Sequence, residues 1–157
     1  MSRRRRAIKR QTIPDPIYNS VTIAKFVNKV MEGGKKSTAQ RIVYNALTKF
    51  AEKVKTENVI EAFDKVLENA MPLLEVKTRR IGGANYQVPV EIPAGRRQAM
   101  AMVWIIGFSR SKPSRSMEEA LASELTECFN MQGATIKKKE EVHRQAEANK
   151  AFAHFKF

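Results

Sequence analysis

One segment of this chain, residues 75–92, breaks a hydrophobic pattern that is otherwise helical. It reads EVKTRRIGGANYQVPVEI, and apolar residues flank its Gly82-Gly83 pair as in two strands joined by a tight turn. On both sides of this segment, apolar residues recur at helical spacing instead. The sequence therefore predicts a mainly α fold, a bundle of about six helices with one protruding β-hairpin between the third and the fourth.

The helix boundaries follow from local signals. The apolar stripes span residues 23–31, 39–54, 59–70, 93–110, 117–130 and 135–150. The signals that delimit them are a C-terminal cap at Gly33-Gly34, a capping box of Ser37 and Gln40, a stop at Pro72, and a capping box of Ser116 and Glu119. The stripe at 93–110 is apolar on most sides, which predicts a central helix covered by its neighbours.

The register of the hairpin can be argued from the faces of its strands. A two-residue loop at Gly82-Gly83 would scatter the apolar residues over both faces, whereas a three-residue loop of residues 81–83 gathers them on one. The longer loop gives the pairs Val76 with Val88, Leu74 with Val90, and Thr78 with Tyr86. We predict this register, with arms about 20 Å long at roughly 3.3 Å per residue that lift a polar end away from the helices.

The basic residues are concentrated in two segments. The formal net charge is +13, from 29 Lys and Arg against 16 Asp and Glu. Residues 1–10 hold six basic and no acidic residues, residues 76–116 hold eight basic residues and only Glu91, and the rest of the chain carries 15 of each sign. An excess confined in this way is expected for a surface that binds a polyanion, most often a nucleic acid.

Each basic group has a functional and a plainer interpretation. The N-terminal arm cannot bury apolar area and is expected to meet phosphates, although a targeting signal or a solvated tail would look similar. The GGKKST segment at 33–38 lacks P-loop spacing and a preceding strand, so it is a turn that presents two lysines beside a helix N-terminus, or an ordinary exposed turn. The loop SRSKPSRS at 109–116 alternates cations with hydroxyls, as suits a sugar-phosphate backbone or a solvated linker.

Two arginines, Arg96 and Arg97, stand at a helix start, where the helix dipole favours anions and a nearby phosphate would be stabilising. We predict that these groups together bind nucleic acid. The predicted binding residues are Arg3, Arg4, Arg5, Arg6, Lys9, Arg10, Lys35, Lys36, Lys77, Arg96, Arg97, Arg110, Lys112 and Arg115.

Other functional classes find no support in the residues. The single Cys128 excludes an intrachain disulfide and is expected in the core. His143, with Glu140 and Glu147 nearby in sequence, is interpreted as a surface salt-bridge cluster rather than a metal site. The longest apolar stretch, residues 99–108, is too short to cross a bilayer, and no catalytic motif is present. We expect a soluble intracellular protein without metal, cofactor, membrane contact or enzymatic activity.

Two rival functions remain open at this point. The first two predicted helices could form the helix-turn-helix of a DNA-binding regulator, although the broad apolar stripe of the second helix and the position of the charge argue against it. An RNA-modifying enzyme would need a pocket motif that the sequence lacks. Compared with these rivals, the residues favour a non-enzymatic helical protein that binds a structured nucleic acid.

Five segments resemble a known family, small-subunit ribosomal protein seven in its bacterial or organellar form. They are IPDPIYNS, KFVNKVMEGGKKSTAQRIVYNAL, KTRRIGGANYQVPVEI, RSMEEALASEL and VHRQAEANKAFAHFKF, in the same order and along nearly the whole chain. The end, AFAHFKF, departs from the tyrosine and terminal tryptophan of many bacterial relatives. Phenylalanine keeps a stacking surface there but lacks their hydrogen-bond donors.

The resemblance implies a function, partners and a location. Similar proteins bind the three-prime major domain of small-subunit rRNA, nucleate assembly of the subunit head, and lie at the subunit interface near the exit-site tRNA and the mRNA path. They also contact small-subunit ribosomal proteins nine and eleven. The expected location is the ribosome of the cytoplasm, or of an organelle matrix or stroma. Some family members repress their own message, a property that does not transfer by resemblance.

The resemblance also assigns roles along this chain. The chain is expected to form one domain with a basic arm at 1–12, a hairpin finger at 73–92, and a C-terminal helix and tail at 135–157. The finger would reach toward the exit site. The residues expected at its end are Arg79, Arg80, Asn85 and Tyr86.

Overall fold

The computed structural model describes residues 11–155 of the chain. Within this range the helices are α1 (Val21–Val30), α2 (Lys36–Val54), α3 (Val59–Ala70), α4 (Ala94–Ser111), α5 (Met117–Phe129) and α6 (Gly133–Ala148), followed by the 3-10 helix η1 (Lys150–Phe155). Between α3 and α4, the strands β1 (Leu74–Ile81) and β2 (Ala84–Glu91) form a two-stranded antiparallel sheet. The predicted fold class is confirmed.

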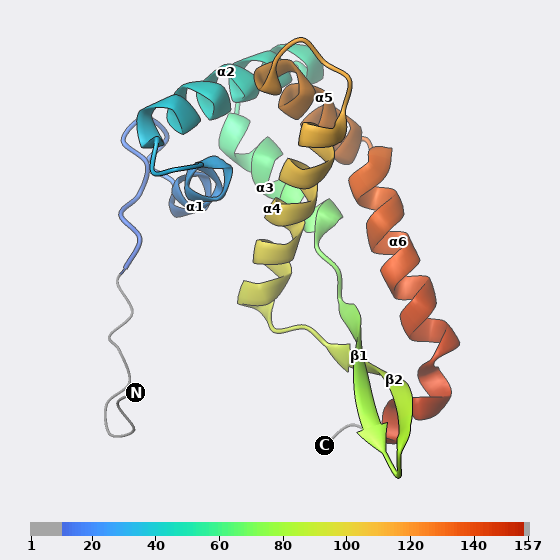
Figure 1. The fold of residues 1–157 in the computed structure, drawn as a ribbon. Coiled ribbons are helices and arrows are strands. Elements are labelled where there is room, and N and C mark those ends of the chain that lie inside the picture. Colours follow the sequence, from blue (N-terminus) through green and yellow to red (C-terminus); the bar gives the residue numbers. More distant parts are fainter. Residues whose placement is uncertain (1–10, 156–157) are drawn as a thin grey trace, which may run out of the picture.

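The hairpin projects from one end of the helical bundle (Figure 1). The helices α2 and α5 lie at the opposite end, and α4 runs between the two ends. Because α6 descends toward the hairpin, η1 at its end contacts β2. The central helix predicted at 93–110 is confirmed as α4, which contacts α1, α3, α5 and α6.

The apolar core lies among the six helices and stops short of the hairpin end. The rings of Phe26 and Phe63 meet edge to face at 5.1 Å between centroids, and both side chains are fully buried. Ile105 of α4 and Leu125 of α5 are also fully buried in this cluster. Cys128 is buried as predicted, and desolvation together with the charge of Glu124 raises the pKa of its thiol to about 12. This thiol is a core group and not a nucleophile.

The helix termini correct two of the predicted capping signals. Ser116 does cap α5, because its hydroxyl accepts a hydrogen bond of 3.3 Å from the backbone N–H of Glu119. The capping box predicted for Ser37 and Gln40 is wrong, since α2 begins at Lys36 without any side-chain cap. The glycine cap predicted for the first helix is also wrong, because α1 ends at Val30 and Met31 takes the cap position. The glycines at 33–34 shape the loop that follows.

The predicted hairpin register is wrong. The loop has two residues, Gly82 and Gly83, with φ of 56° and 90°, and positive φ at both loop positions is the backbone of the primed turns that match strand twist. The observed pairs include Glu75 with Val90, Val76 with Pro89, Lys77 with Val88, and Arg79 with Tyr86.

The physical reason is that both faces of the hairpin base are covered. Val88 is fully buried on one face, and Pro89 is buried on the other. The face of Leu74 and Pro89 lies over residues of α6 and η1, with which it lines a common hollow. The apolar residues therefore do not have to share a single face, and the turn geometry decides the register.

One buried carboxylate holds the segment that leads into α1. Asp15 is 4% exposed, and its Oδ2 accepts hydrogen bonds of 3.2 Å from the backbone N–H groups of Ile17 and Tyr18. The Tyr44 hydroxyl of α2 donates to Oδ1 at 2.7 Å. Burial and the hydrogen bond to Asp15 raise the pKa of Tyr44 to about 12. This clamp fixes the direction in which the chain enters the bundle.

Replacing Tyr44 with Phe tests the clamp. The change leaves Oδ1 of Asp15 without its donor, so we expect the free energy of unfolding in urea at pH 7 to fall by about 2 kcal/mol. The wild-type chain should lose the same contribution as the pH rises from about 10 toward 12, because the unfolded chain releases the tyrosine proton first. Equal stability of the two chains at pH 7 would contradict this role.

Candidate nucleic-acid interface

The predicted binding residues fall on four parts of the chain. The arm residues lie outside the described range 11–155; they are Arg3, Arg4, Arg5, Arg6, Lys9 and Arg10. The remaining residues lie at the turn between α1 and α2, at the two ends of α4, and along the hairpin. The structure brings some of these side chains together at the surface and directs others into the protein.

Lys35 and Lys36 are exposed at the start of α2. The loop before them turns through Gly33 and Gly34, whose φ values of 57° and 75° suit glycine and strain other residues. The first turn of α2 contains no acidic residue and no side-chain cap. Neither lysine forms an ion pair with another residue in the described range. Both side chains are therefore available to an anion.

Two arginines extend this region around the end of α4. Arg110 pairs through Nη2 with Oε1 of Glu32 at 2.6 Å and lines, with Lys35, a hollow of about 630 Å³. Arg115, exposed in the loop that follows, lines a second hollow beside Arg110. We call Lys35, Lys36, Arg110 and Arg115 the turn cluster. It gathers cations from three separate segments of the chain.

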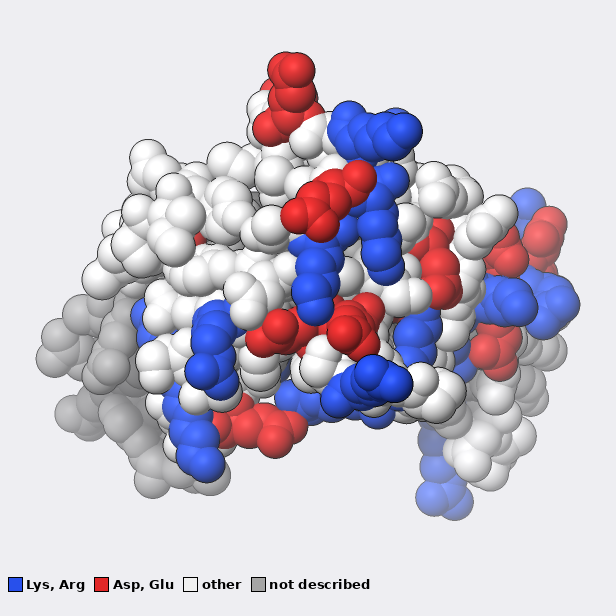
Figure 2. Space-filling view, turned by 90° about the horizontal axis from the view of Figure 1, so that it is seen from above, with Lys and Arg blue, Asp and Glu red and all other residues white. Residues whose placement is uncertain are grey.

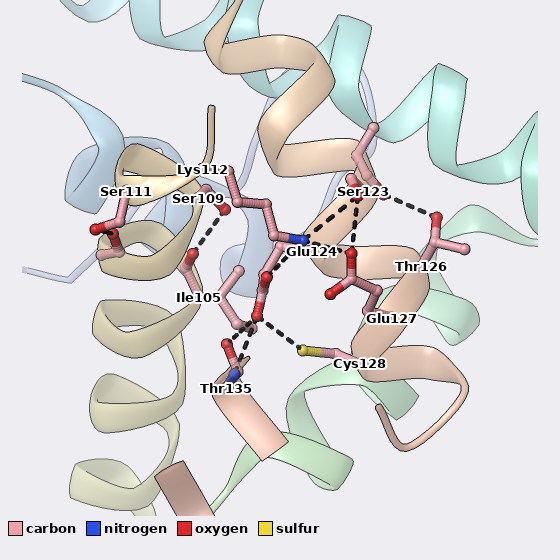
Figure 3. Close-up of polar contacts among 12 residues, drawn as sticks. Ile105, Ser109, Ser111, Lys112, Ser123, Glu124, Thr126, Glu127, Cys128 and Thr135 are labelled. Atoms are coloured by element: carbon pink, nitrogen blue, oxygen red, sulfur yellow. Dashed lines mark hydrogen bonds and ion pairs between the residues drawn. The ribbon is translucent and has the colours of Figure 1, made fainter. Parts of the chain in front are cut away.

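Lys112 points into the protein instead (Figure 3). Its Nζ lies 2.8 Å from Oε2 of Glu124 and 2.5 Å from Oε1 of Glu127. Glu124 is fully buried, and its Oε1 accepts hydrogen bonds of 2.6 and 3.1 Å from the hydroxyl and backbone N–H of Thr135. Burial works to lower the pKa of Lys112, but the hydrogen bonds to the two carboxylates raise it above its ordinary value. The network joins the end of α4 to α5 and α6.

Replacing Lys112 or Arg115 with methionine distinguishes a cation that stabilises the fold from one that is only exposed at the surface. Lys112→Met leaves the buried Glu124 carboxylate uncompensated, so we expect the free energy of unfolding in urea to fall by about 3–5 kcal/mol. Arg115→Met removes a cation that makes no ion pair in the described range, and should change stability by no more than about 0.5 kcal/mol. Equal effects of the two substitutions would show that the buried network is not what stabilises this end of α4.

A second internal ion-pair group lies at the base of the hairpin. Glu75 is 8% exposed and pairs with Lys77 at 3.1 Å and with Arg96 at 3.0 Å. Burial works to raise the pKa of Glu75, but the hydrogen bonds from Arg96 and Lys77 bring it below its ordinary value. The Nε of Arg97 donates to the carbonyl oxygen of Ile92 at 2.6 Å. The sequence predicted a bound phosphate near the arginines at the start of α4. In the structure, Arg96 pairs with the carboxylate of Glu75 instead.

The end of the hairpin is polar, and the C-terminal segment braces one side of it. Arg79, Arg80 and Asn85 are exposed. Tyr86 is half-buried, with its ring centroid 5.5 Å from that of Phe152 in η1. Beside it, Nδ2 of Asn149 donates to Oε1 of Gln87 at 3.4 Å. The finger is thus held from the side and not only from its base.

Replacing Phe152 with Ala tests this brace. We expect faster hydrogen exchange of the backbone amides of β1 and β2, because the ring that packs on Tyr86 is lost. The urea midpoint of the bundle should change little, since Phe152 lies outside the core cluster. Lys150→Ala, in the same segment, is the control. Exchange rates that match the wild type would mean that the hairpin is held from its base alone.

A hollow of about 420 Å³ between α1 and α4 is not among the features predicted from the sequence. Its lining residues are Lys25, Asn28, Lys29, Gly95, Gln98, Ala99 and Met102, with no acidic residue among them. On α1 the polar residues at 25, 28 and 29 follow helical spacing opposite the apolar stripe, and this signal was available in the sequence. The residues of α4 that complete the hollow could not be predicted in this way, because they lie far from α1 along the chain. We call this feature the α1–α4 hollow.

The end of the molecule formed by α2 and α5 carries charges of both signs, which we call the face of mixed charge. Figure 2 shows Lys and Arg side chains intermingled with Asp and Glu across this face. On it, Lys49 pairs with Glu119 at 3.9 Å, and Asn45 donates to Glu118 at 3.0 Å. A surface of mixed sign does not attract a polyanion as a cluster of cations does.

His143 has a structural contact. Its Nε2 accepts a hydrogen bond of 2.9 Å from the backbone N–H of Leu73, which ties α6 to the start of the hairpin. Desolvation and the charge of Lys139 lower its pKa. The predicted salt-bridge cluster is wrong, because no ion pair joins His143 to Glu140 or Glu147. Between residues 11 and 155, no three His, Cys, Asp or Glu side chains are grouped to hold a metal ion. No helix in that range could span a membrane.

Comparison with known proteins decides the family. The sequence profile of the family described as "Ribosomal protein S7p/S5e" matches residues 2–150. The chain belongs to the S7p/S5e family of ribosomal proteins. This confirms the family predicted from the sequence, and an S7p/S5e protein has a structural role and not an enzymatic one.

Relatives of this S7p/S5e protein match it from end to end. "Small ribosomal subunit protein uS7" of Protochlamydia amoebophila (strain UWE25) is 67% identical over 157 residues, 100% of both chains. Proteins of the same name from Chlamydia abortus and Chlamydia felis are 65% and 64% identical, again over 100% of both chains.

Proposed function

We propose that this S7p/S5e protein is a primary rRNA-binding protein of the small ribosomal subunit. It binds the three-prime major domain of small-subunit rRNA and nucleates assembly of the subunit head. The observation that carries the proposal is the full-length likeness, at 67% identity, to a protein named for the small ribosomal subunit. The net charge of +13 supports a polyanionic partner.

The turn cluster and the arm supply the phosphate contacts in this proposal. Lys35, Lys36 and Arg115 are exposed and make no ion pair in the described range. The partly exposed side chains of Arg110, Lys77 and Arg96 widen the basic surface while also pairing with carboxylates. Each phosphate that these groups neutralise releases counterions, so affinity should fall with salt.

The hairpin has a separate role in the proposal. Its end lies away from the bundle, where Arg79, Arg80 and Asn85 are exposed beside Tyr86. We assign this end to the subunit interface, near the exit-site tRNA and the mRNA path. Small-subunit ribosomal proteins nine and eleven are the proposed protein neighbours, and the ribosome of the cytoplasm or of an organelle is the proposed location.

No described feature favours a DNA-binding regulator. In a helix-turn-helix, α2 would have to insert into the major groove. One side of α2 is buried in the core through residues such as Val43 and Phe50. Its outer side belongs to the face of mixed charge.

A filter-binding titration tests the proposal. The protein is titrated against the isolated head domain of small-subunit rRNA, with duplex DNA and tRNA as competitors, over a range of salt concentrations. We expect tight binding that resists both competitors and weakens with salt. Equal affinity for all three nucleic acids would reduce the protein to a nonspecific polycation and contradict the proposal.

A variant pair locates the phosphate contacts within the same assay. Lys35→Gln with Lys36→Gln should weaken binding and lower the slope of log affinity against log salt by about two, roughly one for each lysine. The matched control is Lys49→Gln with Lys53→Gln in α2, on the face of mixed charge. This variant should leave the slope unchanged. An unchanged slope in the first variant would show that Lys35 and Lys36 make no phosphate contacts.

A further inference from the structure

The α1–α4 hollow holds an arrangement that phosphate binding alone does not explain. We propose that it receives one unpaired nucleotide of the rRNA, and that the side-chain amides of Asn28 and Gln98 read the edge of its base. The inference rests on the proposed function and deepens it, because it separates residues that read bases from residues that hold phosphates.

The two amides line the hollow from different helices. Asn28 belongs to α1 and Gln98 to α4, and these helices are in contact. Neither side-chain amide forms a hydrogen bond with another residue in the range 11–155. Each amide offers both donors and an acceptor, the combination that pairs with the edge of a base. Because both residues stand on packed helices, their backbone positions are fixed before any ligand arrives, and their side-chain amides remain unpaired in the described range.

Apart from Gln98, the α4 side of the hollow is lined by small or apolar residues. Gly95 has no side chain, and no atom beyond its chain neighbours and the nearby backbone of α4 lies within 4 Å of the position that a Cβ would take. Ala99 is small and half-buried, and Met102 is an apolar residue only 2% exposed. No aromatic ring is among the lining residues, so recognition would use the edge of the base and van der Waals contact rather than stacking.

The charges around the hollow suit a nucleotide. Lys25 and Lys29 are exposed one helical turn apart, on either side of Asn28 in the sequence, and neither forms an ion pair in the described range. No acidic side chain lines the hollow. Two lysines flanking an amide provide for phosphates on both sides of one base. The volume of about 420 Å³ lies within the roughly 300–1,000 Å³ range of small-ligand sites.

The nucleotide must be unpaired. In an A-form RNA helix the major groove is too deep and narrow for side chains to read, and sequence-specific proteins therefore recognise bases splayed out of loops and bulges. A hollow between two helices can accept such a base and cannot accept a duplex. The site thus selects a particular position in a folded RNA.

Two variants with opposite signatures test the inference in the filter-binding assay. Asn28→Ala with Gln98→Ala should weaken binding to the head-domain rRNA by about tenfold or more, without changing affinity for tRNA or the salt slope. Lys25→Gln with Lys29→Gln should weaken binding to both RNAs alike and lower the slope by about two. Urea midpoints and helical spectra, measured also on each single alanine variant, show that the proteins are folded.

A reagent that modifies the Watson–Crick edge of unpaired bases gives a second readout. One base of the head domain should be protected by the wild-type protein and by the lysine variant at saturation, and reactive with the amide variant. If the amide variant keeps wild-type affinity and protection, or weakens binding to every RNA equally, base reading at this site is refuted while the proposed function stands. If the wild-type protein does not prefer head-domain rRNA, the proposed function itself fails.

Discussion

The structure depends on the burial of α4 by the other helices. Ala101 and Ile105 of α4 are fully buried, and the helix contacts α1, α3, α5 and α6. The hairpin leads directly into its first turn, and the loop that carries Arg115 leaves from its last. Core packing therefore positions the cations at both ends of α4 before any RNA is bound. An interface positioned in this way loses less conformational freedom on binding than one built on mobile loops.

Internal ion pairs divide the basic residues into two kinds. The nearly buried Glu75 and the fully buried Glu124 recruit three cations, Lys77, Arg96 and Lys112, to hold the hairpin base and the α4–α5 junction. Removing any of these cations acts on folding as well as on binding, because a buried carboxylate without a partner is costly. In the described range, no ion pair with a carboxylate involves Lys35, Lys36 or Arg115. Substitutions of these three residues therefore report on RNA contact most directly.

The sequence predicted the elements that depend on local periodicity. It could not predict the contacts that form between segments far apart along the chain. The helices and the existence of the hairpin followed from apolar stripes, Gly82-Gly83 and Pro72. The register did not, because α6 and η1 cover the second face of the hairpin base from the far end of the chain. The partners of Lys112 were hidden for the same reason. The α1–α4 hollow likewise exists only once two separated helices have packed.

Lysine acetylation in the complex with head-domain rRNA, read by mass spectrometry, shows which surface of the protein the RNA covers. We propose that RNA covers the turn cluster and the α1–α4 hollow and leaves the face of mixed charge in solvent. RNA should therefore protect Lys35, Lys36, Lys25 and Lys29 from acetylation, while Lys49 and Lys53 react as they do in the free protein. Protection of Lys49 and Lys53, with Lys35 and Lys36 still reactive, would contradict this proposal.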